Sequence, residues 1–185
     1  MRPIRNLVMA TVFLSLALAQ SSEKGVTRNA VYFLKDDSDK QWCAYASESR
    51  FKAQIESLKA VVVGGASYSD GRLLTVRVTE TDETGDWAVN DEYTCDKSGK
   101  IQTLRRTINI LPENSSEEQF FVIEKGRAVK QRSVYRELRT GKATGKSVNW
   151  FEAPPVITAT GAFPFWPLIG SRRGEVWSRG SVCIP

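Results

Sequence analysis

The residues from Val61 to Leu138 alternate between apolar and polar side chains, in runs that turn signals separate. This pattern indicates antiparallel β-hairpins, because the side chains of a strand point to opposite faces in turn. Asp70-Gly71 is the strongest turn signal, since both residues tolerate the positive φ angles of a type I′ turn. Lys125-Gly126 marks another turn. The stretch therefore predicts an antiparallel meander, around which the rest of the chain is organised.

One convincing helix precedes the meander. Phe51, Ile55 and Leu58 recur at helical spacing and define an apolar stripe, while charged residues fill the opposite face. Earlier still, residues 31–34 and 42–46 predict a first hairpin around a turn rich in Asp and Ser. We therefore expect an α+β fold, in which one helix packs on a twisted antiparallel meander of roughly five to seven strands.

Residues 60–64, with the sequence AVVVG, resemble the Q-x-V-x-G segment of the cystatins, and Trp166 follows later in the chain. One helix followed by an antiparallel meander is also the cystatin layout. The resemblance implies a cystatin-like fold, or a half-barrel of similar shape. Ala60 stands where the motif has Gln, and the expected hairpin tip at Asp70-Gly71 lies well past the motif. Protease inhibition is therefore not carried over, because a shared architecture does not imply a shared function.

The first 19 residues predict a signal peptide. A basic start precedes an apolar run over 7–19, which is shorter than the roughly 20 residues of a membrane-spanning helix. Residues 17–19 match an A-x-A cleavage site, and the alternative is an uncleaved anchor. We expect a secreted or periplasmic protein with no membrane span after cleavage. Residues 20–185 suit a single domain, in which 141–185 form an extended segment rich in Pro and Gly.

The chain has three cysteines, Cys43, Cys95 and Cys183. Export predicts a disulfide, because oxidising compartments preserve such bonds. The odd number leaves one thiol over, and the pairing does not follow from the sequence. A pair that includes Cys183 is favoured, since little else in the final residues would hold the tail in place.

Charge is unevenly distributed, although the formal net charge of +5 is too mild to indicate nucleic-acid binding. Residues 79–92 hold six acidic residues and no base, whereas 125–146 hold eight bases and one acid. The simplest interpretation is two solvated surfaces. The alternative is a site for an anionic ligand or lipid headgroup.

Alternation sorts the side chains of each predicted strand onto two faces of the sheet. The apolar face collects Leu74, Val76 and Val78, then Trp87, Val89, Tyr93 and Cys95, and finally Leu104, Ile108 and Ile110. The opposite face is rich in Thr. Because antiparallel sheets commonly bury one face and leave the other wet, we expect the helix stripe to cover the apolar face.

Four polar residues fall on the apolar face by the same alternation: Glu80, Asp91, Gln102 and Arg106. A turn over 96–99 that pairs Cys95 with Lys100 would place Arg106 diagonally across from Asp91. A buried charge needs a partner, so we expect these two residues to form an ion pair. The pair either holds the sheet together or forms the polar floor of a concave pocket between helix and sheet.

The chain contains no histidine. This excludes Ser-His-Asp and Cys-His catalysis and removes the commonest general base and zinc ligand. Hydrolysis by paired carboxylates is the remaining chemistry, with Glu80 and Asp91 as its candidates. No catalytic residue, metal site or cofactor is predicted.

We therefore expect an exported binding or interaction module, whose partner is a small apolar or anionic ligand or another protein. The candidate pocket residues are Trp87, Asp91, Tyr93 and Arg106. The alternatives are a structural or assembly protein and a small hydrolase without histidine. An assembly protein would use a basic strand (Lys130, Arg132 and Arg136) or an aromatic tail (Phe163, Phe165 and Trp166). We interpret that tail as a cover over the core, with a docking surface as the other choice.

Overall fold

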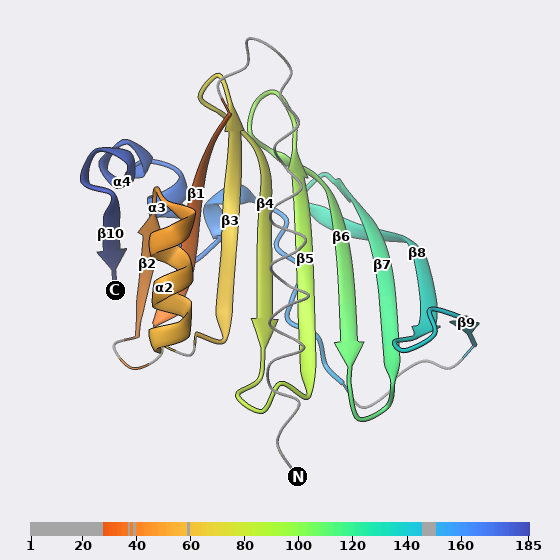
Figure 1. The fold of residues 1–185 in the computed structure, drawn as a ribbon. Coiled ribbons are helices and arrows are strands. Elements are labelled where there is room, and N and C mark those ends of the chain that lie inside the picture. Colours follow the sequence, from red (N-terminus) through yellow and green to blue (C-terminus); the bar gives the residue numbers. More distant parts are fainter. Residues whose placement is uncertain (1–27, 37, 39, 59, 146–150) are drawn as a thin grey trace.

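The computed structural model describes residues 28–185 except 37, 39, 59 and 146–150, so the expected signal peptide lies outside the described residues. These residues form one ten-stranded antiparallel sheet in the order β10-β2-β1-β3-β4-β5-β6-β7-β8-β9, with short helices on both faces (Figure 1). The α+β class is confirmed. The sheet has more strands than the expected five to seven, because the first hairpin and two short end strands join it.

The described strands and helices have the following bounds. The strands are β1 (Arg28–Asp36), β2 (Gln41–Tyr45), β3 (Val62–Ser69), β4 (Arg72–Thr81), β5 (Trp87–Cys95), β6 (Ile101–Ile110), β7 (Ser115–Glu124), β8 (Arg127–Glu137), β9 (Ala143–Thr144) and β10 (Ser181–Ile184). The helices are α2 (Glu48–Leu58), the 3₁₀ turn η2 (Thr160–Ala162), α3 (Trp166–Ile169) and α4 (Arg173–Arg179). None of the described helices is long and apolar enough to cross a membrane.

Helix α2 packs on the face of the sheet opposite to the one expected. Phe51 and Ile55 are buried against Leu34 of β1 and Val63 of β3, in a cluster separate from the main core. The neighbouring residue Phe33 points to the other face and belongs to the main core. Strands β1 and β3 are therefore apolar on both faces, which lets a second layer pack on each side.

The main core lies under the C-terminal residues 151–185, called the covering segment here, which run behind the sheet in Figure 1. Phe163, Phe165 and Leu168 are each at most 2% exposed. The Phe165 ring stacks on Phe33 with 3.9 Å between the ring centroids, and Phe163 meets Tyr93 edge-on at 5.1 Å. The segment is not simply extended as expected, because it contains α3 and α4.

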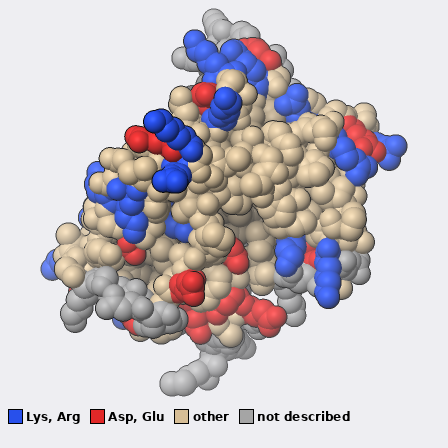
Figure 2. All heavy atoms as spheres, turned by 180° about the vertical axis from the view of Figure 1, so that it is seen from behind, with Lys and Arg blue, Asp and Glu red and all other residues tan. Residues whose placement is uncertain are grey.

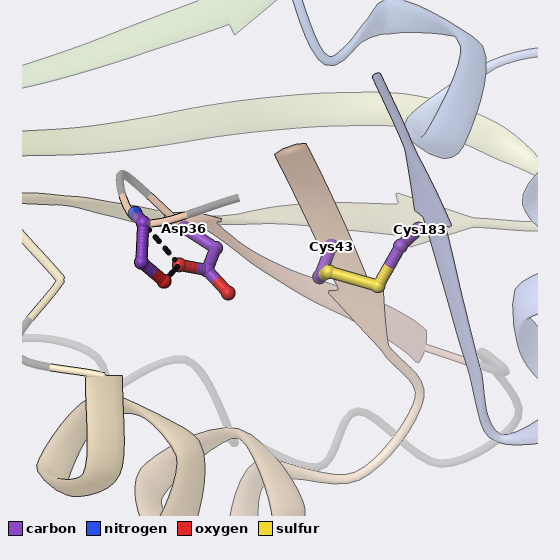
Figure 3. Close-up of a disulfide and its surroundings, with 4 residues drawn as sticks. Asp36, Cys43 and Cys183 are labelled. Atoms are coloured by element: carbon purple, nitrogen blue, oxygen red, sulfur yellow. Dashed lines mark hydrogen bonds between the residues drawn. A yellow bond between two sulfur atoms is a disulfide. The ribbon is translucent and has the colours of Figure 1, made fainter. Parts of the chain in front are cut away.

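A disulfide joins Cys43 of β2 to Cys183 of β10, which lie directly opposite each other (Figure 3). The preference for a pair that includes Cys183 is confirmed. Cys95 is free and buried. The bond fastens the end of the covering segment to the edge of the sheet.

Three register shifts interrupt the ladder, at Ser67/Tyr68, Thr94/Cys95 and Phe120/Phe121. Each shift leaves one extra residue on one strand and so changes which side chains share a face. The first pairs Leu73 with Tyr68, and Leu73 takes the buried place expected for Leu74. The second pairs Cys95 with Ile101 and leaves Gln102 exposed. The prediction that Gln102 lies on the apolar face is therefore wrong.

Candidate functional site

Asp91 and Arg106 form the ion pair that the sequence predicts, in a corrected geometry. They lie directly opposite each other on β5 and β6, rather than diagonally, because Cys95 pairs with Ile101 instead of Lys100 and the shift at Thr94/Cys95 adds a further residue. Arg106 donates from Nε to Asp91 Oδ1 and from Nη2 to Oδ2, both at 2.7 Å. The Tyr93 hydroxyl donates to Asp91 Oδ2 at 3.1 Å. Such a bidentate arrangement is the strongest form of this contact.

The covering segment closes over this pair. The Arg106 side chain is 4% exposed and that of Asp91 is 10% exposed. Arg106 Nη1 donates to the carbonyl oxygen of Pro154 at 2.6 Å, so each of its three nitrogens is bonded within the protein. Burial acts to lower the pKa of Arg106, but the hydrogen bonds and charge of Asp91 raise it above its ordinary value. This geometry supports a structural ion pair that ties the covering segment to the sheet.

The same contacts bear on the carboxylate pair considered for hydrolysis. Both carboxylate oxygens of Asp91 accept hydrogen bonds from Arg106. Glu80, on the neighbouring strand, is half-buried and lies opposite Val89. Burial, with a smaller contribution from the Asp91 charge, raises the pKa of Tyr93. Both carboxylate oxygens of Asp91 are therefore engaged within the protein rather than presented to a substrate.

Trp87, the fourth candidate pocket residue, belongs to a different cluster. Its ring packs on Phe151 with 5.1 Å between centroids, beside Ile108 and Ile110. The hollow at this place, which Ile108, Ile110, Glu117 and Phe151 line, has a volume of about 20 Å³. A hollow of this volume holds about one water molecule, whereas an ordinary ligand pocket has a volume of roughly 300–1,000 Å³. This hollow is therefore too small for a ligand, and none of the four candidate pocket residues lines it.

A polar cluster at the rim of this hollow was missed by the sequence analysis. The carboxylate of Glu117 accepts hydrogen bonds from Gln119 Nε2 at 2.7 Å and from Ser133 Oγ at 2.5 Å. Burial acts to raise the pKa of Glu117, but these bonds and one from Tyr135 hold it below its ordinary value. The sequence pattern places a loop over 112–118, whereas β7 begins at Ser115. Because the predicted loop covers the first residues of β7, the alternation that would have placed Glu117 and Gln119 on one face was not recognised.

The charged runs lie in different parts of the molecule. Figure 2 shows the face that carries the covering segment, with a largely uncharged centre and charged side chains at its rim. The acidic loop over 82–86 follows β4 at one end of the sheet. Of the other acidic residues in that run, Glu92 pairs with Arg77 at 2.8 Å and Asp91 pairs with Arg106. The described bases of the second run, from Lys125 to Lys142, are exposed along β8 and in the turns before and after it.

Lys130, Arg132 and Arg136 of β8 are all exposed, but they do not share one face. An unbroken strand would place these even-numbered residues on the same side. The shift at Phe120/Phe121 instead sets Lys130 opposite Phe121, on the core face. Arg132 lies opposite Phe120, on the other face. The expected basic surface is thus corrected to a basic rim that straddles the edge of the sheet.

Strand β8 is also an open edge over most of its length. Strand β9 pairs only with Tyr135 and Arg136. From Arg127 to Val134, no strand of the described residues pairs with the outer side of β8. Val129, within this stretch, is 39% exposed. Arg127 and Arg132 make no ion pair with another described residue.

The aromatic tail, the free thiol of Cys95 and the acidic side chains give no further candidate site among the described residues. Phe163 and Phe165 are core residues, and Trp166 packs partly buried against the same core, so the aromatic tail is not a surface. Burial, with a contribution from Asp96, raises the pKa of the Cys95 thiol to about 11, which keeps it protonated at neutral pH. Within the described ranges, no three His, Cys, Asp or Glu side chains gather as metal ligands would.

Comparison with protein-family models, with curated proteins and with solved structures gives no match for this chain.

Proposed function

We propose that this protein is an exported, non-enzymatic interaction module that binds an acidic protein partner through the basic edge of its sheet. The basic edge consists of Arg127, Lys130 and Arg132 on the open stretch of β8. One observation carries the proposal: exposed bases stand on both sides of a strand whose outer edge no described strand covers.

Charge along the chain segment that forms the basic edge is strongly one-sided, although the paired strand β7 places Glu124 opposite Arg127. Residues 125–142 hold seven bases and only Glu137 as an acid. The left-hand side of Figure 2, where β8 lies, carries a group of Lys and Arg side chains. Such a field speeds the encounter with an anionic partner and selects against cationic ones.

The shape of this surface favours a protein partner over a membrane. A flat lipid surface attracts bases that share one plane. Here the register shift separates Lys130, on one face, from Arg132, which shares the other face with Arg127. A polypeptide that lies along the edge can meet both residues, because its own side chains alternate between two sides.

Poly-L-glutamate is the probe that tests this function. We expect the purified protein to bind it, and the affinity to fall steeply between about 50 and 300 mM salt, because the contacts are exposed charges. The double substitution Arg127→Glu and Arg132→Glu should weaken binding about ten-fold or more, since it reverses two charges on the edge. Fluorescence anisotropy of labelled poly-L-glutamate measures both effects.

The matched control is Arg72→Glu with Lys97→Glu, which changes the net charge equally at exposed sites on β4 and in the turn between β5 and β6. This variant should bind within about two-fold of the native protein, because its reversed charges lie off β8. Equal weakening by the two variants would mean that only net charge matters and would overturn the proposal. Binding to vesicles of anionic lipid but not to poly-L-glutamate would overturn it as well.

A further inference from the structure

We propose that the acidic partner binds as an extended strand, which pairs with β8 and continues the sheet. This inference rests on the proposed function and adds the mode of binding and the class of partner sequence. Strand addition to an open edge is an established form of peptide recognition, in which backbone hydrogen bonds supply affinity and alternate side chains supply specificity.

The backbone of β8 is oriented for such pairing. Lys125 and Gly126 have φ angles of 50° and 76°, so they form a type I′ turn in which Glu124 and Arg127 are a hydrogen-bonded pair. Because bonding directions alternate along an antiparallel strand, Ala128 and Lys130 direct their N–H and C=O groups outward. At the far end, the Glu137 N–H donates outward to the Lys142 carbonyl at 3.0 Å.

The same alternation, counted back from Glu137, directs the backbone of Ser133 outward. The outer edge therefore offers donors and acceptors at Ala128, Lys130 and Ser133. No described strand uses them, since β9 reaches only to Tyr135. These are the groups that an added strand would engage.

The side chains of β8 specify the partner. Arg127, Val129, Arg132 and Val134 share the face opposite to the core. Base and apolar side chain thus alternate along one side of the edge. A strand laid beside them is stabilised by acidic residues next to the two arginines and apolar residues next to the two valines. Lys130 accepts a further acidic residue on the other face. The partner class is therefore an extended segment in which acidic and apolar residues alternate.

A second copy of this chain does not fit the same edge. Two β8 strands side by side would bring arginines and lysines of like charge together, which is destabilising. Charged edge strands protect sheets from self-association in this way. The basic edge thus excludes its own copy while remaining open to an acidic strand.

Alternate N-methylation of a peptide separates strand pairing from simple charge attraction. The probe is a labelled peptide of about eight residues. Every second residue, and so every residue on one side of the extended peptide, is Glu or Val in turn. Two derivatives carry N-methyl groups on alternate residues, one on the odd positions and one on the even positions. Both keep the charge of the parent. We expect one derivative to bind about ten-fold more weakly or worse, and the other to bind as the parent does, because only one set of N–H groups faces β8.

The outcomes distinguish this inference from the function on which it rests. Equal binding by both derivatives, or equal weakening of both, would overturn strand addition. If the peptides then still respond to salt and to the Arg127→Glu and Arg132→Glu changes, the proposed function stands. If neither the parent peptide nor poly-L-glutamate binds, both proposals fall.

Discussion

Replacing Arg106 with alanine is expected to lower the free energy of unfolding by about 3–5 kcal/mol. The substitution leaves the Asp91 carboxylate, which is 10% exposed, without its bidentate partner. It also removes the donor to the Pro154 carbonyl, which helps to hold the covering segment on the sheet. An uncompensated buried charge is among the few causes of so large a loss. Urea denaturation of the native protein and the variant measures the difference.

Arg105→Ala is the matched control for this change. Arg105 is the preceding residue on β6, its side chain is 61% exposed, and it pairs with Glu118 on the other face of the sheet. An exposed pair of this kind contributes at most about 1 kcal/mol. A loss below about 0.5 kcal/mol for Arg106→Ala would mean that both charges are in water, contrary to the structure. Replacing Asp91 and Arg106 together should cost less than losing Arg106 alone, since no buried charge then remains.

Removing the disulfide is expected to have the second large effect. Cys43 and Cys183 are 140 residues apart in the sequence. Loop-closure entropy in the unfolded chain then accounts for about 5 kcal/mol of stability. Strand β10 also anchors α4 and the end of the covering segment. We expect Cys43→Ala with Cys183→Ala to lower the free energy of unfolding by about 3–5 kcal/mol, as measured by urea denaturation without reductant.

Cys95→Ala supplies the comparison for the disulfide, because it removes the buried free thiol and leaves the Cys43–Cys183 bond intact. Adding a reductant to this variant should reproduce most of the loss seen in the double variant. A double variant less than about 1 kcal/mol below the native protein would contradict the proposed role of the bond in holding the covering segment.

The local features of the fold were predictable from the sequence. Asp70-Gly71 forms the expected turn, with φ angles of 50° and 77°. The helix stripe of Phe51 and Ile55 is buried as its spacing predicts. Asp91 and Arg106 were paired correctly, because alternation places both on the apolar face and a buried charge requires a partner. Each of these inferences uses residues close in sequence or one simple periodicity.

The missed features depend on contacts between distant parts of the chain. One extra residue at a register shift carries no compositional signal, yet it moved Gln102 out of the core and split Lys130 from Arg132. The face chosen by α2 depends on what covers the other face. That cover is the Pro- and Gly-rich C-terminal segment, whose short helices lack any strong periodic pattern. The basic edge itself follows from a shift that alternation alone does not show.

Amide hydrogen exchange with and without the alternating Glu and Val peptide tests the central claim most directly, because it locates the binding surface residue by residue. We expect the peptide to slow exchange at Ala128, Lys130 and Ser133, whose N–H groups face outward. Exchange at Val129, which β7 already protects, and at Arg106 in the core should stay unchanged. Protection confined to the covering segment or to the residues around Asp91, with β8 unaffected, would contradict binding at the basic edge.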